Sequence, residues 1–390
     1  MKDKVHMNDS NIAVIKASVG GVGHNISLAS HYFLSSKTAL RKSKFVSIVG
    51  NDFAGRAILN QLKSSEFDAS GILVTSSDKA TAQYSATHDS DGNLVVAAAD
   101  MSIIEEDFSE FVIDQVSPQV SNIVFDCNLS PTLVNKVMNS LQASNKVVNV
   151  IIEPTSLPKS SRIAKLINRP FPNNFIKLIT PTVSELEAIH ASFYNNDKYD
   201  DYDEWFPVLD SLGVDSFFRD KLNLLASKRF PVLKDLMDRG TLQQSFQLVP
   251  FFQNILIKIG SKGAIMVSLS ENVNDYKSIP TTSKYKPAFI LASEGRVTSD
   301  NKRMGVVIEY FPIPMENENL DIINVTGAGD SMLGTLVAQL SNSPYNWLAT
   351  EINSVEQEWS KWEHIYKAQL ASGLTLTCES AVSSGIQLIE

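Results

Sequence analysis

The sequence is poor in cysteine and in positive charge for its length. Its 390 residues hold two cysteines, Cys127 and Cys378, and 34 Lys plus Arg against 43 Asp plus Glu, so the formal net charge is −9 at pH 7. Two distant cysteines in no metal-like spacing argue against a disulfide framework and are typical of small core residues. The negative charge argues against nucleic acid or an anionic membrane as the main partner.

Long apolar runs are also missing. No stretch reaches the roughly 18 consecutive apolar residues that a membrane-spanning helix needs, and residues 1–6 open no apolar signal region. We therefore expect a cytoplasmic protein with no membrane partner. Hydrophobic residues make up 43% and charged residues 20% of the chain, which is an ordinary balance for a globular core.

Short β-branched runs alternate with amphipathic stretches along the chain. The runs that predict buried strands are 12–19, 45–49, 123–125, 147–152, 176–179 and 255–259. The stretches 24–35 and 53–64 predict helices between them. This alternation indicates an α/β fold, with a central and mostly parallel sheet covered by helices on both faces. We expect residues 1–390 to form a single domain.

A β-hairpin is predicted in the segment at about 70–100. Two β-prone runs, 80–87 and 94–98, flank the dipeptide Asp91-Gly92, and Asp-Gly between such runs is a hairpin signal. A hairpin inserted in an α/β order fits a small lid over a site. An ordinary edge hairpin fits the same pattern, so the two alternatives stay open.

Residues 191–250 form a second departure from the alternation. The acidic, turn-prone run 197–204 is followed by amphipathic stretches at 217–227 and 232–237. The pattern predicts a partly helical insert, with a solvated loop leading into surface helices. A partner-binding surface is the alternative interpretation.

The sequence TGAGD at 326–330 carries the strongest chemical signal. It follows a strand-like run at 322–325 and precedes residues 331–340, whose apolar side chains fall on one helical face. A helix start offers free N–H groups and a positive dipole end, and the two glycines let phosphate approach them. Asp330 is then either a first-turn helix cap or a general base for phosphoryl transfer to a hydroxyl.

Four glycine-containing motifs together resemble those of the PfkB (ribokinase-like) carbohydrate kinase family. In chain order they are GGVGHN at 20–25, GNDFAG at 50–55, IGSKG at 259–263 and NVTGAGDS at 324–331. The resemblance covers nearly the whole chain from residue 12 onward, and the hairpin falls where the family carries its lid. It implies a ribokinase-like fold and a kinase that uses ATP and Mg²⁺ to phosphorylate a primary hydroxyl of a sugar or nucleoside.

The resemblance also implies roles for individual residues. Asp330 would be the general base, with the N–H groups of Gly327, Ala328 and Gly329 as the anion hole. Glu185 would help to hold Mg²⁺, through water in one alternative, although Thr182 stands where the family has Asn. The implied substrate-binding residues are Gly20, Gly21 and Asn25, with Thr81 and Gln83 from the hairpin, and the nucleotide-binding residues are Thr326, Gly260, Ser261 and Gly263. A monovalent cation is a further candidate cofactor.

Several stretches are similar to family members that phosphorylate pseudouridine, namely 20–26, 80–84, 95–101, 125–130 and 153–156. They imply transfer to the 5′-hydroxyl of a nucleoside, giving pseudouridine 5′-phosphate, and a functional link to the glycosidase that splits this product. The alternatives are a kinase for another nucleoside or a ribose-like sugar, or an inactive homologue that binds only nucleotide or a partner. A monomer and a homodimer both fit the sequence.

The family's usual first strand has no counterpart in this sequence. That strand ends in an Asp that binds the sugar hydroxyls, whereas the single strand candidate ahead of Gly20, residues 12–19, matches the family's second piece. Asp3 and Asp9 lie in polar, turn-like sequence. We therefore expect the first strand and its Asp to be missing, which motivates the inactive alternative.

Overall fold

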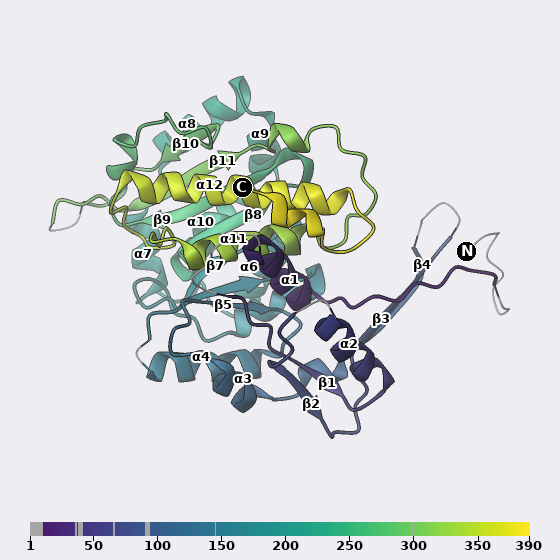
Figure 1. Ribbon diagram of the computed structural model, residues 1–390. Coiled ribbons are helices and arrows are strands. Elements are labelled where there is room, and N and C mark those ends of the chain that lie inside the picture. Colours follow the sequence, from purple (N-terminus) through teal and green to yellow (C-terminus); the bar gives the residue numbers. More distant parts are fainter. Residues whose placement is uncertain are drawn as a thin grey trace.

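A seven-stranded sheet forms the centre of the protein (Figure 1). The computed structural model describes residues 11–35, 37, 42–64, 67–89, 94–144, 146–297 and 300–390. The sheet has the order β10-β11-β9-β8-β7-β6-β5. Its strands are β5 (Asn122–Asp126), β6 (Asn149–Glu153), β7 (Ile176–Ile179), β8 (Asn254–Lys258), β9 (Ala264–Ser270), β10 (Phe289–Ala292) and β11 (Gly305–Phe311). Only β9 and β10 run against the others, so the predicted mostly parallel sheet is confirmed.

Helices cover both faces of this sheet because successive strand residues point to opposite sides. In β6, Val150 and Ile152 enter one hydrophobic cluster, while Ile151 enters the other. The second cluster is closed by α1 (Val22–Ser35), α11 (Ala328–Asn342) and α12 (Val355–Leu376). The first is closed mainly by α4 (Pro131–Ala143), α6 (Val183–Asn195), α8 (Ser216–Lys228), α9 (Pro231–Asp238) and α10 (Thr241–Phe252). The predicted α/β architecture with two helical layers is therefore confirmed.

Most predicted elements are found within a few residues of their expected positions. The remaining helices are α2 (Phe53–Ser64), α3 (Ser109–Gln115), α5 (Leu157–Ser160) and α7 (Trp205–Ser211). The strands predicted at 45–49, 123–125, 147–152, 176–179 and 255–259 correspond to β1 (Ser47–Gly50), β5, β6, β7 and β8. The predicted helices 24–35, 53–64 and 331–340 are α1, α2 and α11. None of the helices in the described ranges is long and apolar enough to cross a membrane.

Two small sheets lie outside the central one. Strand β1 pairs in parallel with β2 (Ile72–Thr75), and β3 (Gln83–His88) pairs with β4 (Leu94–Asp100) in an antiparallel hairpin. The hairpin prediction is confirmed, although its Asp91-Gly92 turn lies outside the described residues. Figure 1 shows the hairpin as an arm that projects from the body.

The strand predicted at 12–19 was wrong. From residue 11 the described chain runs without helix or strand to α1, and Ile12 and Ile15 are 74% and 91% exposed. The strand-like run 322–325 is likewise an exposed coil. Both runs have β-branched residues but pair with no strand in the described part of the chain, and pairing decides whether a strand forms. Within the described residues β5 has no strand on its outer edge, while Asp3 and Asp9 lie outside them.

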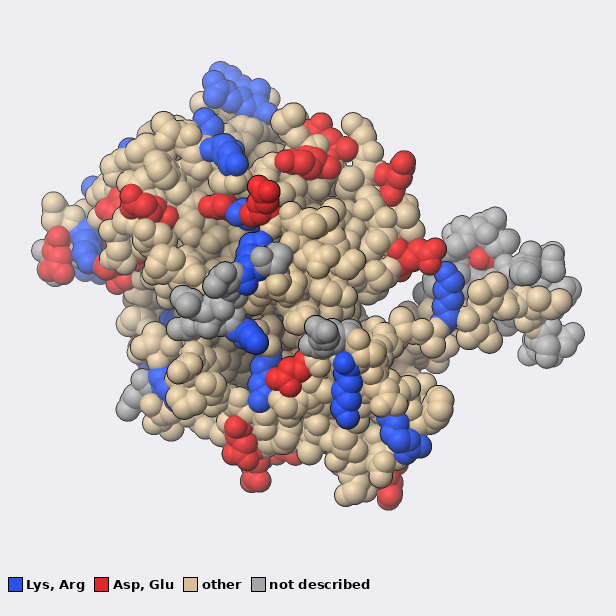
Figure 2. All heavy atoms as spheres, in the orientation of Figure 1, with Lys and Arg blue, Asp and Glu red and all other residues tan. Residues whose placement is uncertain are grey.

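The segment 191–250 is mainly helical. Its acidic run 197–204 forms turns, and the amphipathic stretches at 217–227 and 232–237 lie in α8 and α9. The apolar side of α8 is buried in the first hydrophobic cluster, for example at Phe218. The loop, α8 and α9 thus lie where the pattern predicts them, whereas α10, which begins within this segment, is largely buried. Figure 2 shows acidic and basic side chains interspersed over the visible face.

A buried ionic cluster joins β11 to α12. The Lys361 Nζ lies 2.5 Å from the Glu309 Oε2 and 2.5 Å from the Glu358 Oε2. All three side chains are at most 2% exposed. The Trp362 Nε1–H donates to the other Glu309 oxygen at 2.8 Å. The sheet and its covering helix are thus held together by charges as well as by apolar packing.

The four tryptophans of the chain all lie after residue 200. Each indole N–H has a partner: Trp205 donates to the Gln247 carbonyl, Trp347 to His364, Trp359 to the Pro280 carbonyl and Trp362 to Glu309. Trp347 and Trp362 are buried in the second hydrophobic cluster. Burial lowers the pKa of His364 to about 3, so its ring stays neutral and accepts the Trp347 N–H at Nδ1.

Candidate active site

Helix α11 begins at a glycine whose backbone conformation and close surroundings both disfavour a side chain. Gly327 has a φ of 81°, and a Cβ at this position would lie 1.9 Å from the carbonyl oxygen of Ala381. The first N–H groups of the helix, at Ala328 and Gly329, have no carbonyl partner within the helix. They point outward at the positive end of the helix dipole. The geometry of this helix start suits the binding of an anion such as phosphate.

Asp330 lies in the first turn of α11 and is partly buried. The Asn25 Nδ2 of α1 donates to the Asp330 Oδ2 at 2.8 Å. Burial raises the pKa of Asp330 to about 6, although the Asn25 hydrogen bond and the Lys258 charge oppose this shift and Glu153 adds to it. A carboxyl with such a pKa can exchange protons near neutral pH, as a general base requires.

The glycine turn ahead of α1 is open. Gly21 has a φ of 105°, and a Cβ at Gly20 or Gly21 would meet nothing within 4 Å. The Asn25 N–H donates to the Gly21 carbonyl at 2.9 Å, which starts the helix. A Cβ on Gly23, in contrast, would lie 2.8 Å from the Asp126 Oδ2. The glycines thus leave an exposed turn and let α1 approach the end of β5.

Asp126 is a candidate site residue to which sequence reasoning gave no role. It ends β5, accepts the Asn128 N–H at 2.8 Å, and burial raises its pKa. Its charge also raises the pKa of Asp330, so the two carboxyls lie within electrostatic reach. The available signal was an Asp at the carboxyl end of a predicted parallel strand, which is where α/β proteins bind ligands.

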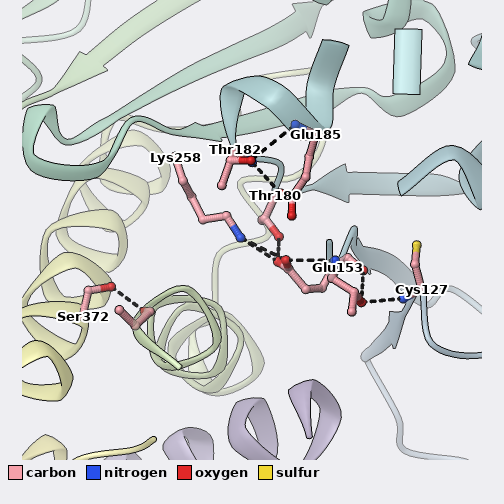
Figure 3. Close-up of polar contacts among 9 residues, drawn as sticks. Cys127, Glu153, Thr180, Thr182, Glu185, Lys258 and Ser372 are labelled. Carbon is pink, nitrogen blue, oxygen red and sulfur yellow. Dashed lines mark hydrogen bonds and ion pairs between the residues drawn. The ribbon is translucent and has the colours of Figure 1, made fainter. Parts of the chain in front are cut away.

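A second missed cluster joins the ends of three parallel strands (Figure 3). The Lys258 Nζ, at the end of β8, lies 3.0 Å from both carboxylate oxygens of Glu153, at the end of β6. The Thr180 hydroxyl, just after β7, donates to the Glu153 Oε2 at 2.6 Å. Glu153 is 3% exposed, so a charged group is held in a buried position. These residues are 105 positions apart at the widest, and no local pattern marks the pair.

Thr182 and Glu185 form a capping box at the start of α6. The Thr182 N–H donates to the Glu185 Oε2 at 2.8 Å, and the Glu185 N–H donates to the Thr182 hydroxyl at 3.3 Å. Thr at the family's Asn position thus completes the T-x-x-E capping signature. The Glu185 Oε1 makes no hydrogen bond within the described part of the chain.

The GNDFAG turn uses Thr81 to fix its own shape. The Thr81 hydroxyl donates to the Asp52 Oδ1 at 2.7 Å and accepts the Gly50 N–H at 2.9 Å. Hydrogen bonds from Gly55 and Thr81 lower the pKa of Asp52 to about 2. Thr81 is 2% exposed, whereas Gln83 is exposed on β3. The structure thus places Thr81 against this turn and Gln83 at the base of the hairpin arm.

The IGSKG loop directly follows Lys258. Gly263 has a φ of 95°, and a Cβ there would lie 2.1 Å from the Phe311 carbonyl oxygen. Gly260 and Ser261 are exposed, as is Thr326 ahead of α11. The loop and the helix start are therefore linked by Lys258, whose side chain passes Gly329. A cavity of about 580 Å³ lies elsewhere, between α12 and the last residues of the chain, and none of its lining residues belongs to the Asp330 cluster.

Gly327→Ala is expected to lower kcat by about 10²-fold, because the new Cβ must push the helix start away from Ala381 and misplace its N–H donors. Steady-state kinetics would measure the loss. The matched control is Gly240→Ala, since Gly240 has a similar φ of 73° but nothing within 4 Å of the new Cβ. Equal kcat values for the two variants would show that the close contact at Gly327 is unimportant.

The chain belongs to the pfkB family of carbohydrate kinases, because residues 5–199 match the sequence profile described as pfkB family carbohydrate kinase. It also has the ribokinase-like fold. A solved ribokinase from Cryptococcus neoformans in complex with ADP superposes with a TM-score of 0.55 at 13% identity, over 98% of this chain and 91% of that one. Such an identity shows a shared fold alone.

Two relatives are named for pseudouridine. The pseudouridine-metabolizing bifunctional protein of Schizosaccharomyces pombe is 28% identical over 370 residues, which cover 95% of this chain and 42% of that protein. The pseudouridine kinase of Escherichia coli is 28% identical over 169 residues, which cover 43% of this chain and 50% of that protein. The chain therefore spans about half the length of these relatives.

Proposed function

We propose that this chain transfers the γ-phosphoryl group of ATP to the 5′-hydroxyl of a nucleoside, with Asp330 as the general base. The observation that carries the proposal is the position of Asp330 in the first turn of α11, beside the free N–H groups and bonded to Asn25 at 2.8 Å. The helix dipole and the N–H groups stabilise bound phosphate, while the carboxyl accepts the proton of the attacking hydroxyl.

The transfer is a single displacement at the γ-phosphorus. The hydroxyl oxygen forms the new O–P bond as its proton passes to Asp330, and the bond to the bridging oxygen breaks so that ADP leaves with the electron pair. The N–H groups of Gly327, Ala328 and Gly329 stabilise the charge that develops on the phosphoryl oxygens. The Asn25 amide orients the Asp330 carboxyl before and during the reaction.

The residues present fit a nucleotide and one magnesium ion. The N–H groups at the start of α11 have no carbonyl partner within the helix and can receive phosphate oxygens, and the exposed loop at Gly260 and Ser261 follows Lys258 in the chain. Glu185 has one carboxylate oxygen left for Mg²⁺ or its water. A single carboxylate suits Mg²⁺, which is commonly held by few protein ligands plus substrate phosphates. When bound, the ion would neutralise phosphate charge.

Pseudouridine is the substrate we favour. Both relatives named above carry that word in their names, and one of them is described as bifunctional. Asp126 and Asn25, beside the open turn at Gly20 and Gly21, supply acceptors and donors for ribose hydroxyls. We also propose that the product feeds a pseudouridine 5′-phosphate glycosidase.

The test measures ADP release and identifies the phosphorylated product by mass spectrometry. The purified chain would be given ATP with pseudouridine, uridine, inosine or ribose. We expect the highest kcat/KM with pseudouridine and phosphorylation at its 5′-position. A preference for another acceptor would change the substrate but keep the reaction class. ATP binding by calorimetry with no product from any acceptor would instead favour a module that only binds nucleotide.

The activity is expected to fall as the pH drops through about 6. Asp330 acts as a base only when it is deprotonated, and burial raises its pKa to about 6. Below that pH, kcat/KM should fall about tenfold for each pH unit, and above it should level off. A pH profile from 4.5 to 8 would check this. A flat profile down to pH 5 would contradict the assignment of Asp330 as the titrating base.

A further inference from the structure

Lys258 has a buried ion-pair partner but lies directly beside the helix start. Its backbone N–H donates to the Pro181 carbonyl at 2.8 Å, which fixes the end of β8. A Cβ on Gly329 would lie 3.3 Å from the Lys258 Nζ and 3.7 Å from its Cδ. The lysine stem therefore passes along the space that the missing Gly329 side chain leaves. Its positive charge lowers the pKa of Asp330, so it also acts on the proposed base.

Glu153 is the fixed member of the ion pair. It is 3% exposed and accepts the Thr180 hydroxyl at 2.6 Å, whereas the Lys258 side chain is 14% exposed. A lysine has a flexible four-carbon stem and three donor hydrogens. Two contacts to Glu153 leave one donor, and rotation of the stem can move the ammonium toward α11 while Glu153 stays in place.

We propose that Lys258 is a catalytic residue that binds the γ-phosphate, and that Glu153 holds its ammonium ready beside the anion hole. This inference rests on the proposed phosphoryl transfer. An ammonium at this position supplements the N–H groups of α11, because the negative charge of the transferred phosphoryl group is spread over three oxygens. The bonds formed and broken are those of the displacement described above, and Lys258 keeps its protons throughout.

Lys258→Met is expected to lower kcat by about 10²- to 10³-fold, since it removes a preorganised positive charge that stabilises the transferred phosphoryl group. The variant also leaves Glu153 buried without its cation, so loss of activity alone could reflect a damaged fold. The double variant Lys258→Met/Glu153→Gln removes both charges and keeps both shapes. We expect it to unfold at the wild-type temperature and yet to remain as slow as the single variant. Lys234→Met, which breaks an exposed pair with Asp238, is the matched control with wild-type kcat.

A binding measurement separates this inference from the proposed function. Calorimetry would compare ATP with ADP, which lacks the γ-phosphate, on wild type and on the double variant. We expect about a tenfold loss of ATP affinity and no change for ADP. Equal effects on both nucleotides, or wild-type kcat in the double variant, would overturn the role of Lys258. A wild-type chain that never forms product would defeat the proposed function, while the difference between ATP and ADP would still test the lysine.

Discussion

Asp330→Asn is expected to lower kcat by about 10³-fold, near the middle of the range that a positioned general base contributes. Asparagine keeps the shape of the side chain and can still accept the hydrogen bond that Asn25 donates at 2.8 Å. It cannot take the proton of the attacking hydroxyl. ATP affinity should hold or increase, because a carboxylate no longer faces the phosphates. Single-turnover kinetics and calorimetry with ATP would measure the two quantities.

The control for this substitution is Asp238→Asn, at an exposed partner of Lys234, which should retain the wild-type kcat. The residual activity of Asp330→Asn should also lose its dependence on pH near 6, since the titrating group is gone. Wild-type kcat in the Asp330 variant would remove this residue from the chemistry. Weak ATP binding together with low kcat would instead place its effect on the helix start.

Lys361→Met is expected to cost about 3–5 kcal/mol of stability, the usual effect of removing one partner from a buried ionic cluster. Burial alone would lower the pKa of Lys361, but Glu309 and Glu358 hold it above its ordinary value. Without the lysine, two carboxyls at most 2% exposed would face each other. Urea unfolding monitored by tryptophan fluorescence would measure the loss in the free energy of unfolding.

The pH dependence and two further variants make this prediction specific. Burial raises the pKa of Glu358. A carboxyl whose pKa is higher in the folded than in the unfolded state makes the protein less stable as the pH rises. The loss in Lys361→Met should therefore be larger at pH 8 than at pH 5. Lys361→Met/Glu358→Gln should recover part of it, whereas Lys234→Met on the surface should cost no more than about 1 kcal/mol. A surface-sized loss in Lys361→Met would show that the cluster is unimportant for stability.

The sequence could predict what local patterns determine. Short β-branched runs identified β5 to β8, and amphipathic stretches identified α1, α2 and α11, because each pattern belongs to a single element. The run 12–19 failed for the complementary reason. Its β-branched residues suit a strand, but a strand forms only where another strand offers its backbone, and this is a property of the whole fold.

The site divides in the same way. The position of Gly327 and Asp330 at a helix start was predictable because a glycine turn, a helix start and an acid are contiguous in the chain. Lys258 and Glu153 lie on separate strands, and only the parallel sheet brings the ends of β8 and β6 together. The capping box of Thr182 and Glu185 was within reach, since T-x-x-E is a local signature.

The distribution of the tryptophans gives the protein a built-in spectroscopic division. Trp205, Trp347, Trp359 and Trp362 all lie in the later half of the chain, and Trp359 and Trp362 belong to α12, where they share the second hydrophobic cluster with Trp347. Intrinsic emission therefore reports on the surroundings of α7 and of α12, whereas β1, the hairpin arm and α2 carry no tryptophan. If fluorescence and far-ultraviolet dichroism yield different unfolding midpoints, the earlier part of the chain melts separately, and a ligand that tightens only that part will be invisible to indole emission.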